Sequence, residues 1–478
     1  MAARNGETYL KGLRDNRNIW MDGHRISDVV DHPALKGAAQ TLAAVYDLQL
    51  ENSEICLGDD PETKKKTSRS HMIPRSREDL FKRHACLKKI AEFTVGLMGR
   101  TPDYLNVTFA GFVGDKSAWA SNGNEAGAER LSLYQQQLME HDWCLTHAIV
   151  SPGSDKSQGD APRADDAITL HKVENTEHGI LVRGSKALAT LAPFADEITV
   201  YPRTPMPEGS EKYMLAFSIP LSTPGLKFLC RDSMSTPRQD FDHPFSGRFD
   251  EQDAFVIFDN VEIPHERVFI DGNINVYNTV MTKTWMPNIM QQTMIRACVK
   301  LKFAWALGRR MAAAVNDQSL ATKQMLGEIW CYSEFAQAAV AAAEAKAFDQ
   351  GEEFWTPSVE PLFALRSMLP SWFPRVSEIL KLIGSHYMLA APRADQLHDE
   401  EMGGLIEEFM GGADGIDAKE RAKIFRLGWD FLGSQMAARN EQYERFYLGS
   451  GARNLQSVLR IADTAYSDSL VDQFLREE

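Results

Sequence analysis

The spacing of apolar residues changes twice along the chain, and these changes limit the possible folds more than any single motif does. Helical spacing holds from about residue 1 to 145, short strand-like segments separated by Pro, Gly and Asp fill 146–275, and helical spacing returns over 276–478. This order predicts an α+β, mainly helical protein with three domains. They are a helical domain over 1–145, a compact antiparallel β-barrel or sandwich over 146–275 and a helical bundle over 276–478.

The same spacing predicts individual elements. Helices are expected over 31–48, 75–98 and 126–140, and strands over 168–170, 180–182, 197–201, 213–217, 226–229 and 254–258. Four long helices over 288–314, 319–347, 372–389 and 417–447 suggest a four-helix bundle. Because ligands favour domain interfaces, a cofactor is expected between the β domain and the bundle.

Composition narrows the class of protein. The 478 residues carry a net charge of −14, which argues against nucleic acid or an anionic membrane as the main partner. The N-terminus lacks a signal-like apolar segment, and no apolar run approaches the length of a membrane span. Six scattered cysteines without a CxxC pair indicate reduced thiols rather than disulfides or zinc ligands. We therefore expect a cytoplasmic protein without a metal site.

Several common catalytic motifs are absent from the sequence. No GxGxxG follows a predicted strand, and there is no P-loop, HExxH or GxSxG. The one Glu-x-x-His pair, Glu262 and His265, spans Pro264 at a strand end, so it cannot supply the helical ligand pairs of a di-iron bundle.

The segment 93–109, FTVGLMGRTPDYLNVTF, places an arginine and a tyrosine at a predicted helix break. Gly99 is interpreted as the end of one helix, Thr101 as the N-cap of the next and Pro102 as its first residue. Arg100 then lies in the connection, where its side chain can point into a pocket. The alternative is an ordinary helix junction with a surface arginine.

Six segments in order give the chain a specific resemblance. They are YLKGLRDNRNIWMDGHRISDVVDHPA, MGRTPDY, DWCLTHAIVSPGSDKS, VRGSKALATLAPFADEITVYP, VIFDNVEIPHERVFI and FRLGWDFLGSQMAARNEQYERFYLGSG. From end to end the chain resembles the oxygenase component of two-component, FADH2-dependent aromatic monooxygenases, the 4-hydroxyphenylacetate 3-monooxygenase family. The resemblance implies the acyl-CoA dehydrogenase fold, with an N-terminal helical domain, a β-barrel and a C-terminal four-helix bundle, assembled as a homotetramer or dimer.

The family resemblance also implies the reaction, which belongs to aromatic catabolism. A separate NAD(P)H:flavin reductase supplies FADH2, O2 adds at the flavin C4a carbon, and the resulting hydroperoxide transfers oxygen to the ring carbon ortho to a phenolic hydroxyl. The family's active-site arginine, tyrosine and histidine match Arg100, Tyr104 and His147, which would also bind the substrate. Arg100 would supply a fixed positive charge and Tyr104 a hydrogen bond. His147, with an ordinary pKa near about 6.5, would accept the phenolic proton.

The flavin contacts are carried over in the same way. They are His147, Ala148, Ile149, Gly153, Ser154, Asp155, Lys156, Leu188, Ala189, Thr190, Leu448, Gly449, Ser450 and Gly451. Thr190 would hydrogen-bond near flavin N5, and the glycines after the last helix would admit the pyrophosphate. Two of these assignments have a structural alternative. Thr190 could be a strand residue with a local hydrogen bond, and Leu448 to Gly451 could be a helix end.

The sequence does not determine which substituent the substrate carries besides its phenolic hydroxyl. Family members that act on 4-hydroxyphenylacetate carry small hydroxyl residues where this chain has Arg203, which could pair with a carboxylate or point to solvent. Nitrophenols, chlorophenols, phenol, anthranilate-like and heteroaromatic acids all remain open as substrates.

Two other functions are alternatives to the hydroxylase. An acyl-CoA dehydrogenase-type enzyme would bind oxidised FAD and a thioester and would need a catalytic carboxylate such as Glu378 or Glu407. A non-catalytic scaffold would not need Arg100, Tyr104 and His147 together. The iron–sulfur 4-hydroxybutyryl-CoA dehydratase of the same superfamily is rejected because the chain lacks its paired N-terminal cysteines.

Overall fold

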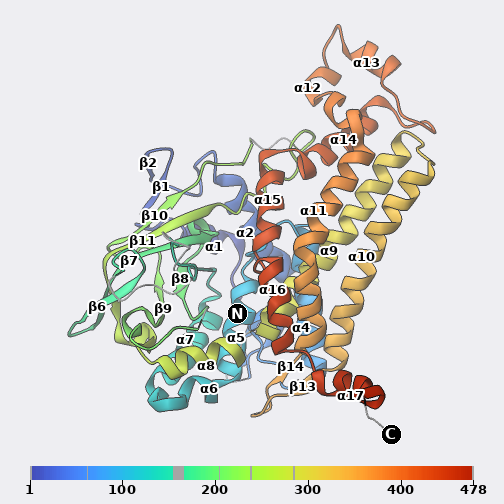
Figure 1. Cartoon of the computed structure of the whole chain (residues 1–478). Coiled ribbons are helices and arrows are strands. Elements are labelled where there is room, and N and C mark those ends of the chain that lie inside the picture. Colours follow the sequence, from blue (N-terminus) through green and yellow to red (C-terminus); the bar gives the residue numbers. More distant parts are fainter. Residues whose placement is uncertain are drawn as a thin grey trace.

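The structure, a computed structural model, is mainly helical, with two β-sheets on one side and long parallel-running helices on the other (Figure 1). It describes residues 3–61, 63–153, 166–203, 205–236, 240–283 and 286–475. Among these residues no helix is long and apolar enough to cross a bilayer. The same residues contain no cluster of three or more His, Cys, Asp or Glu side chains arranged to hold a metal ion.

The N-terminal region is helical, as predicted from its spacing. Its helices are α1 (Gly6–Gly12), α2 (Lys36–Glu51), α3 (Ser53–Cys56), α4 (Arg77–Phe93), α5 (Asp103–Gly114), α6 (Lys116–Ala120) and α7 (Glu125–His141). It also holds strands β1 (Ile19–Met21), β2 (His24–Ile26), β3 (Leu57–Asp59) and β4 (Lys66–Ser68). The helix predicted over 75–98 is shorter than expected, and the connection that follows it carries Arg100.

The break between α4 and α5 lies earlier than predicted. Helix α4 ends at Phe93, and Val95 and Gly96 then adopt positive φ angles of 46° and 71°. A Cβ on Gly96 would lie 2.7 Å from the backbone oxygen of Arg296, so glycine is required where α9 passes close by. Gly96, not Gly99, therefore ends the helix, and α5 begins one residue after Pro102.

The β region consists of two open sheets, so the predicted closed antiparallel barrel is wrong. One sheet has the order β2-β1-β10-β11-β7-β6 and the other β12-β9-β8-β5. The bounds are β5 (Leu145–His147), β6 (His171–Asn175), β7 (Gly179–Thr190), β8 (Glu197–Val200), β9 (Leu215–Pro220), β10 (Leu226–Cys230), β11 (Asp253–Pro264) and β12 (Val268–Asp271). Two pairings are parallel, β1 with β10 and β5 with β8.

The open edges have a physical cause. Strand β6 is largely exposed to solvent, which suits an edge strand but not a closing one. The opposite edge is completed by the β1–β2 hairpin from the N-terminal region. The segment predicted as a strand over 168–170 makes only a single bridge, Thr169 with Ser185, and the regular strand begins at His171.

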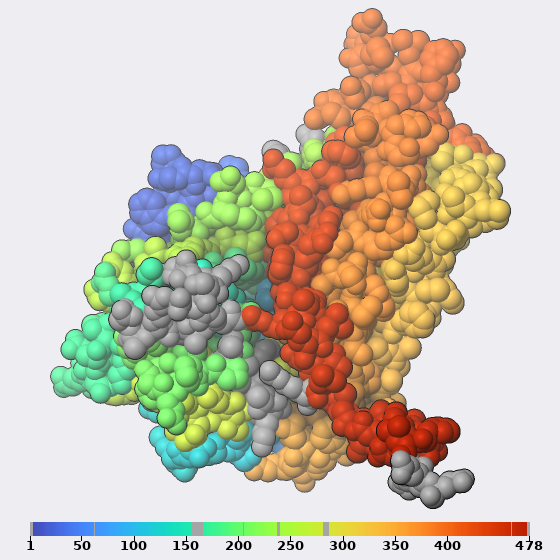
Figure 2. Space-filling view, viewed as in Figure 1, coloured from blue at the N-terminus to red at the C-terminus, as the bar shows by residue number. Residues whose placement is uncertain are grey.

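The C-terminal region forms the helical bundle. Its helices are α8 (Ile274–Lys283), α9 (Met286–Ala314), α10 (Leu320–Ala345), α11 (Val359–Ala390), α12 (Ala394–Leu397), α13 (Gly403–Phe409), α14 (Ala418–Leu432), α15 (Gln435–Phe446), α16 (Gly451–Ser457) and α17 (Thr464–Leu475). A small hairpin of β13 (Phe348–Asp349) and β14 (Trp355–Thr356) joins α10 to α11. Helices α9, α10 and α11 pack against one another, and α14 and α15 pack on α11. In the space-filling view the red α15 and α16 lie between the β region and the orange α11 (Figure 2).

Two bundle helices differ from their predicted extents. Helix α11 begins at Val359, before the predicted 372, because an apolar face with Leu362 and Leu369 continues through Pro370. The helix predicted over 417–447 is divided at Gly433, and Ser434 caps α15 by accepting a hydrogen bond from the Ala437 N–H. The break redirects α15 toward the β region.

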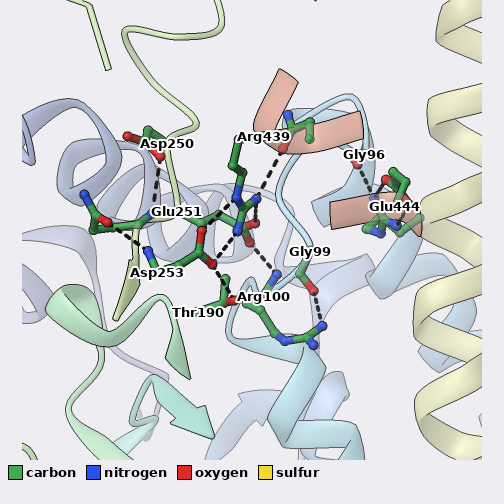
Figure 3. A network of polar contacts seen from close by, with 12 residues as sticks. Gly96, Gly99, Arg100, Thr190, Asp250, Glu251, Asp253, Arg439 and Glu444 are labelled. Atoms are coloured by element: carbon green, nitrogen blue, oxygen red, sulfur yellow. Dashed lines mark hydrogen bonds and ion pairs between the residues drawn. The ribbon is translucent and has the colours of Figure 1, made fainter. Parts of the chain in front are cut away.

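A buried ionic cluster joins α15, α9 and the α4–α5 connection. Glu444 of α15 accepts hydrogen bonds from Arg296 at 2.8 and 3.0 Å and from Lys300 at 2.8 Å. Arg296 also donates to the backbone oxygen of Gly96 at 2.6 Å (Figure 3). All three charged side chains are at most 8% exposed, so the cluster fixes the connection that carries Arg100.

Glu444→Gln is expected to lower the thermal midpoint at pH 7, because Arg296 and Lys300 would keep buried charges without a carboxylate. Removing one partner of a buried pair costs on the order of 3–5 kcal/mol. Burial raises the pKa of Glu444, but Arg296 and Lys300 outweigh it and lower that pKa to about 2. The lowered pKa stabilises the fold above the ordinary value near 4.5, and this stabilisation is lost as the pH falls toward 2.

Calorimetry from pH 7 to pH 3 tests this expectation. The difference in thermal midpoint between wild type and Glu444→Gln should narrow below about pH 4.5. Glu441→Gln on the same helix is the control, because its half-exposed pair with Arg445 contributes little. A difference that stays constant down to pH 3 would contradict the role given to Glu444.

Candidate active site

A cavity of about 1620 Å³ lies between the β region and the bundle, where a ligand site was expected. The β region contributes His147, Ile149, Lys186, Leu188, Thr190 and Arg203 to its wall, and the helical bundle contributes Met290, Arg366, Arg439, Tyr443 and Tyr447. Arg100 and Tyr104 reach it from the α4–α5 connection and the start of α5. The three predicted catalytic residues therefore share one cavity.

Arg100 is held by aromatic rings. Its guanidinium carbon lies 3.9 Å from the ring centroid of Tyr104, 4.6 Å from that of Tyr447 and 5.7 Å from that of Tyr443. No carboxylate of the described residues forms an ion pair with this guanidinium, which is 8% exposed. Burial lowers the Arg100 pKa, but the tyrosines and Glu251 raise it above its ordinary value. The charge is permanent and is available to an anion in the cavity.

The backbone of Arg100 is fixed by a network that crosses from the β region to α15 (Figure 3). Its peptide N–H donates to Glu251 Oε1 at 2.6 Å, and the other oxygen of Glu251 accepts from Arg439 at 2.9 Å. Arg439 also donates to both oxygens of Asp253, at 2.7 and 2.9 Å. Arg231 donates to Asp253 Oδ2 at 2.9 Å. Although burial raises the Asp253 pKa, Arg439 and Arg231 lower it, so Asp253 stays ionised.

Thr190 is part of the same network. Its hydroxyl donates to Asp253 Oδ1 at 2.7 Å, so its remaining capacity toward the cavity is as an acceptor. This bond crosses to the neighbouring strand β11 instead of being local, and it leaves Thr190 able to accept a hydrogen bond from an N–H of a ligand.

His147 and Tyr104 lie edge to face, with ring centroids 5.6 Å apart. His147 Nδ1 hydrogen-bonds the hydroxyl of Tyr201. Burial and then the charges of Arg100 and Arg203 lower the His147 pKa well below its ordinary value, so the expectation of a pKa near about 6.5 is wrong. Burial raises the Tyr104 pKa, so its hydroxyl keeps its proton and can donate.

The remaining predicted residues divide into three groups. Ile149, Gly153, Leu188, Thr190, Arg203, Leu448, Gly449 and Ser450 line the cavity. Ala148 and Ala189 are fully buried behind it, and Gly451 is the first residue of α16. Ser154, Asp155 and Lys156 lie outside the described residues.

Sequence reasoning missed several charged and aromatic residues of the wall. Tyr443 of α15 and Tyr447 at its C-cap are four residues apart, and their rings stack with centroids 4.8 Å apart. This spacing just before Leu448 was a usable signal. Glu251, Asp253 and Arg439 meet only through tertiary packing. Lys186 and Arg366 sit in a strand and a helix without any local motif.

Comparison with known proteins identifies the family of the chain. Residues 5–270 match the family described as 4-hydroxyphenylacetate 3-hydroxylase N terminal, and residues 278–476 match 4-hydroxyphenylacetate 3-hydroxylase C terminal. The chain is 34% identical to the 4-hydroxyphenylacetate 3-monooxygenase oxygenase component of Thermus thermophilus, over 99% of this chain and 98% of that protein. It is 30% identical to the 4-nitrophenol 2-monooxygenase oxygenase component of a Rhodococcus species, over 93% of this chain and 86% of that protein.

Solved structures show the same arrangement. The crystal structure of the oxygenase component of 4-hydroxyphenylacetate 3-monooxygenase complexed with FAD and 4-hydroxyphenylacetate matches with a TM-score of 0.93 and 33% identity, covering 99% of this chain and 98% of that one. An archaeal 4-hydroxybutyryl-CoA dehydratase matches with a TM-score of 0.89 at 18% identity and shares the fold. The predicted mainly helical class is confirmed, while the two main sheets do not close into a barrel.

The lowered His147 pKa predicts a neutral imidazole between pH 6 and pH 8 in the protein without ligand. In protein labelled with ¹³C-histidine, the His147 Cε1 signal, identified by its loss in His147→Gln, should not move across this range. Arg100→Met removes a nearby positive charge and should raise the pKa of His147. A wild-type signal that titrates with a midpoint near about 6.5 would show that the ring is not desolvated in this way.

Proposed function

The chain belongs to the 4-hydroxyphenylacetate 3-hydroxylase family, and on that premise we propose that it hydroxylates a small phenol at the position ortho to the hydroxyl. It is the oxygenase component of a two-component, FADH2-dependent aromatic monooxygenase. The observation that supports the site assignment is the Arg100 guanidinium, held by tyrosine rings beside Tyr104 and His147 and paired with no carboxylate of the described residues.

Arg100 and Tyr104 would act on the substrate oxygen. A phenolate ring carbon is a better nucleophile than that of a phenol, and a fixed cation beside the oxygen favours the phenolate. Tyr104 keeps its proton and can donate a second hydrogen bond to that oxygen. Since both groups are held in place before substrate arrives, little reorganisation is needed during the reaction.

His147 would take the phenolic proton while the phenolate forms. The neutral form that can accept this proton is the tautomer with its hydrogen on Nδ1. In this tautomer Nδ1 donates to the Tyr201 oxygen, and Nε2 keeps a free lone pair. Burial, and then the positive charges of Arg100 and Arg203, keep the pKa of His147 low in the free protein. A bound phenolate offsets that charge and raises the pKa, so the imidazole becomes a better base when substrate is present.

The cavity residues fit a flavin dinucleotide. The cavity has a volume of about 1620 Å³, which can hold a flavin with a small aromatic molecule. Arg366 donates to the Leu448 oxygen at 2.6 Å, beside Gly449, where a Cβ would lie 2.9 Å from Asn454 Oδ1 and 3.3 Å from Arg366 Nη2. Arg366 and the Gly449–Ser450 backbone would hold the phosphates, and Thr190 would accept a hydrogen bond from the ring system. When bound, FADH2 supplies the electrons that activate O2.

The geometry does not support the acyl-CoA dehydrogenase alternative. Glu378 is exposed and pairs with Arg375 at 2.8 Å, and Glu407 is exposed on α13. Neither lines the cavity. The acids that do, Asp166 and Asp253, are engaged by backbone N–H groups and by arginines respectively. No carboxylate of the described cavity wall is placed to remove a proton from a thioester.

The remaining parts of the proposal follow the family. We propose a separate NAD(P)H:flavin reductase as partner, a homotetramer or dimer as the assembly, and the cytoplasm as the location. The three domain boundaries, 1–145, 146–275 and 276–478, stay a prediction.

Arg100→Ala is expected to reduce product formation by about 10² to 10³, the usual effect of removing one group that stabilises a developing oxyanion. Oxygen uptake should continue, with hydrogen peroxide released in place of the hydroxylated product. The assay adds reductase, FAD and NADH, and compares catechol formed with NADH consumed. Arg310→Ala, at an exposed position of α9 outside the cavity, is the control. An unchanged ratio of catechol to NADH in Arg100→Ala would contradict the role of Arg100.

The purified protein is expected to be nearly colourless and to bind FADH2 more tightly than FAD under anaerobic conditions. Reduced flavin reaches this enzyme from another protein, so tight retention of oxidised FAD is not required. Absorbance at 450 nm and anaerobic titration measure both properties. Stoichiometric yellow FAD together with oxidation of an acyl thioester would instead support the dehydrogenase.

A further inference from the structure

The thioether of Met286 faces a guanidinium in the helical wall of the cavity. Met286 is the first residue of α9, and its Sδ lies 3.6 Å from Nη1 of Arg366 on α11. The two helices pack against each other (Figure 1), and both residues line the cavity and are partly exposed. Because a thioether is a weak hydrogen-bond acceptor, this contact holds Arg366 only loosely.

Arg366 is a cation with few strong acceptors. Its Nε donates to the Leu448 backbone oxygen at 2.6 Å, and it forms no ion pair with a carboxylate of the described residues. Burial lowers the pKa of Arg366, which reflects the cost of holding its charge in the wall. In the proposed function this guanidinium and the Gly449 backbone hold the flavin phosphates. A new strong acceptor at Met286 would compete for the same guanidinium.

Oxidation turns a methionine into such an acceptor. A thioether reacts with hydrogen peroxide to give a sulfoxide and water. The O–O bond of the peroxide breaks and an S–O bond forms, so the sulfur loses two electrons and the second peroxide oxygen leaves as water. The sulfoxide oxygen is polar and accepts a charge-assisted hydrogen bond from a guanidinium, which is roughly twice as strong as a neutral one.

The proposed function supplies the oxidant within the same cavity. Without a phenol to hydroxylate, FADH2 and O2 are converted to FAD and hydrogen peroxide. The released peroxide meets the methionines of the described cavity wall, Met206, Met234, Met286 and Met290, before it reaches bulk solvent. Met206 and Met290 are at most 9% exposed, so Met234 and Met286 are the accessible thioethers. Of these two, Met286 is the one in contact with a charged side chain.

We propose that Met286 is an oxidation site through which unproductive turnover lowers the affinity of the protein for reduced flavin. Its sulfoxide accepts a hydrogen bond from Arg366 and draws the guanidinium away from the phosphate position. Loss of the cofactor then slows further formation of peroxide. The source of the oxidant rests on the proposed function, whereas the contact between Met286 and Arg366 does not.

Peptide mass spectrometry locates the sulfoxide. The protein is incubated with reductase, FAD, NADH and O2 without a phenol, and catalase removes peroxide from bulk solution. Met286 is expected to be oxidised several-fold more than Met368 and Met402, which are 40% and 47% exposed and lie outside the cavity. With added hydrogen peroxide and no flavin, the two exposed methionines should be oxidised before Met286, because oxidation then follows exposure.

Anaerobic titration with FADH2 measures the consequence. Peroxide treatment that oxidises Met286 should weaken FADH2 binding by wild type about tenfold, the effect of losing one charged hydrogen bond. Met286→Leu keeps an apolar side chain that cannot form a sulfoxide, so its affinity should be the same before and after treatment. Met286→Gln carries an amide oxygen as a permanent strong acceptor and should bind FADH2 as weakly as oxidised wild type.

Met368→Leu is the matched control, because it removes an exposed methionine of α11 outside the cavity. This variant should lose affinity on peroxide treatment as wild type does. An equal loss in Met286→Leu would assign the effect to another residue and overturn the oxidation site. Unchanged FADH2 affinity of wild type after Met286 is oxidised would overturn it as well.

The turnover experiment separates this proposal from the proposed function. Peroxide formation with Met286 still reduced in the presence of catalase would overturn the oxidation site and leave the hydroxylase assignment intact. A complete system that yields neither a hydroxylated phenol nor peroxide would refute the proposed function, and with it this source of oxidant.

Discussion

The site depends on one buried positive charge that is held by aromatic rings instead of by a carboxylate. Three tyrosine rings lie around the Arg100 guanidinium, while Glu251 binds its peptide N–H and Arg439 binds Glu251. A carboxylate paired directly with the guanidinium would neutralise it. Fixing the backbone through Glu251 positions the charge yet leaves it free to stabilise a phenolate.

This arrangement also explains why the cavity can be cationic in an acidic protein. The chain carries a net charge of −14, yet Arg100, Lys186, Arg203 and Arg366 all line the same cavity. The acids nearby are committed to arginines or to backbone N–H groups. Their charges therefore do not cancel the field that an anionic substrate and a flavin dinucleotide would meet.

Much of the site was predictable because its parts lie in short segments with strong local signals. Arg100 and Tyr104 are in one segment with a glycine, a proline and an apolar helix, and the family resemblance supplied His147. The predictions that proved wrong concern where one helix ends and how the strands are joined into sheets. The helix stop lies at Gly96 because α9 passes there, and the barrel is two open sheets because β6 is solvated and a distant hairpin completes the other edge.

The sequence by itself determined the order of helical and strand regions and the absence of common nucleotide and metal motifs, and it pointed to Arg100, Tyr104 and His147, which line one cavity. Apolar periodicity and local motifs act over a few residues, so one chain is enough to read them. Tertiary structure alone decided the Glu251–Arg439 network and the low pKa of His147. These arise from desolvation and from charges that are distant in the sequence, which no local pattern encodes.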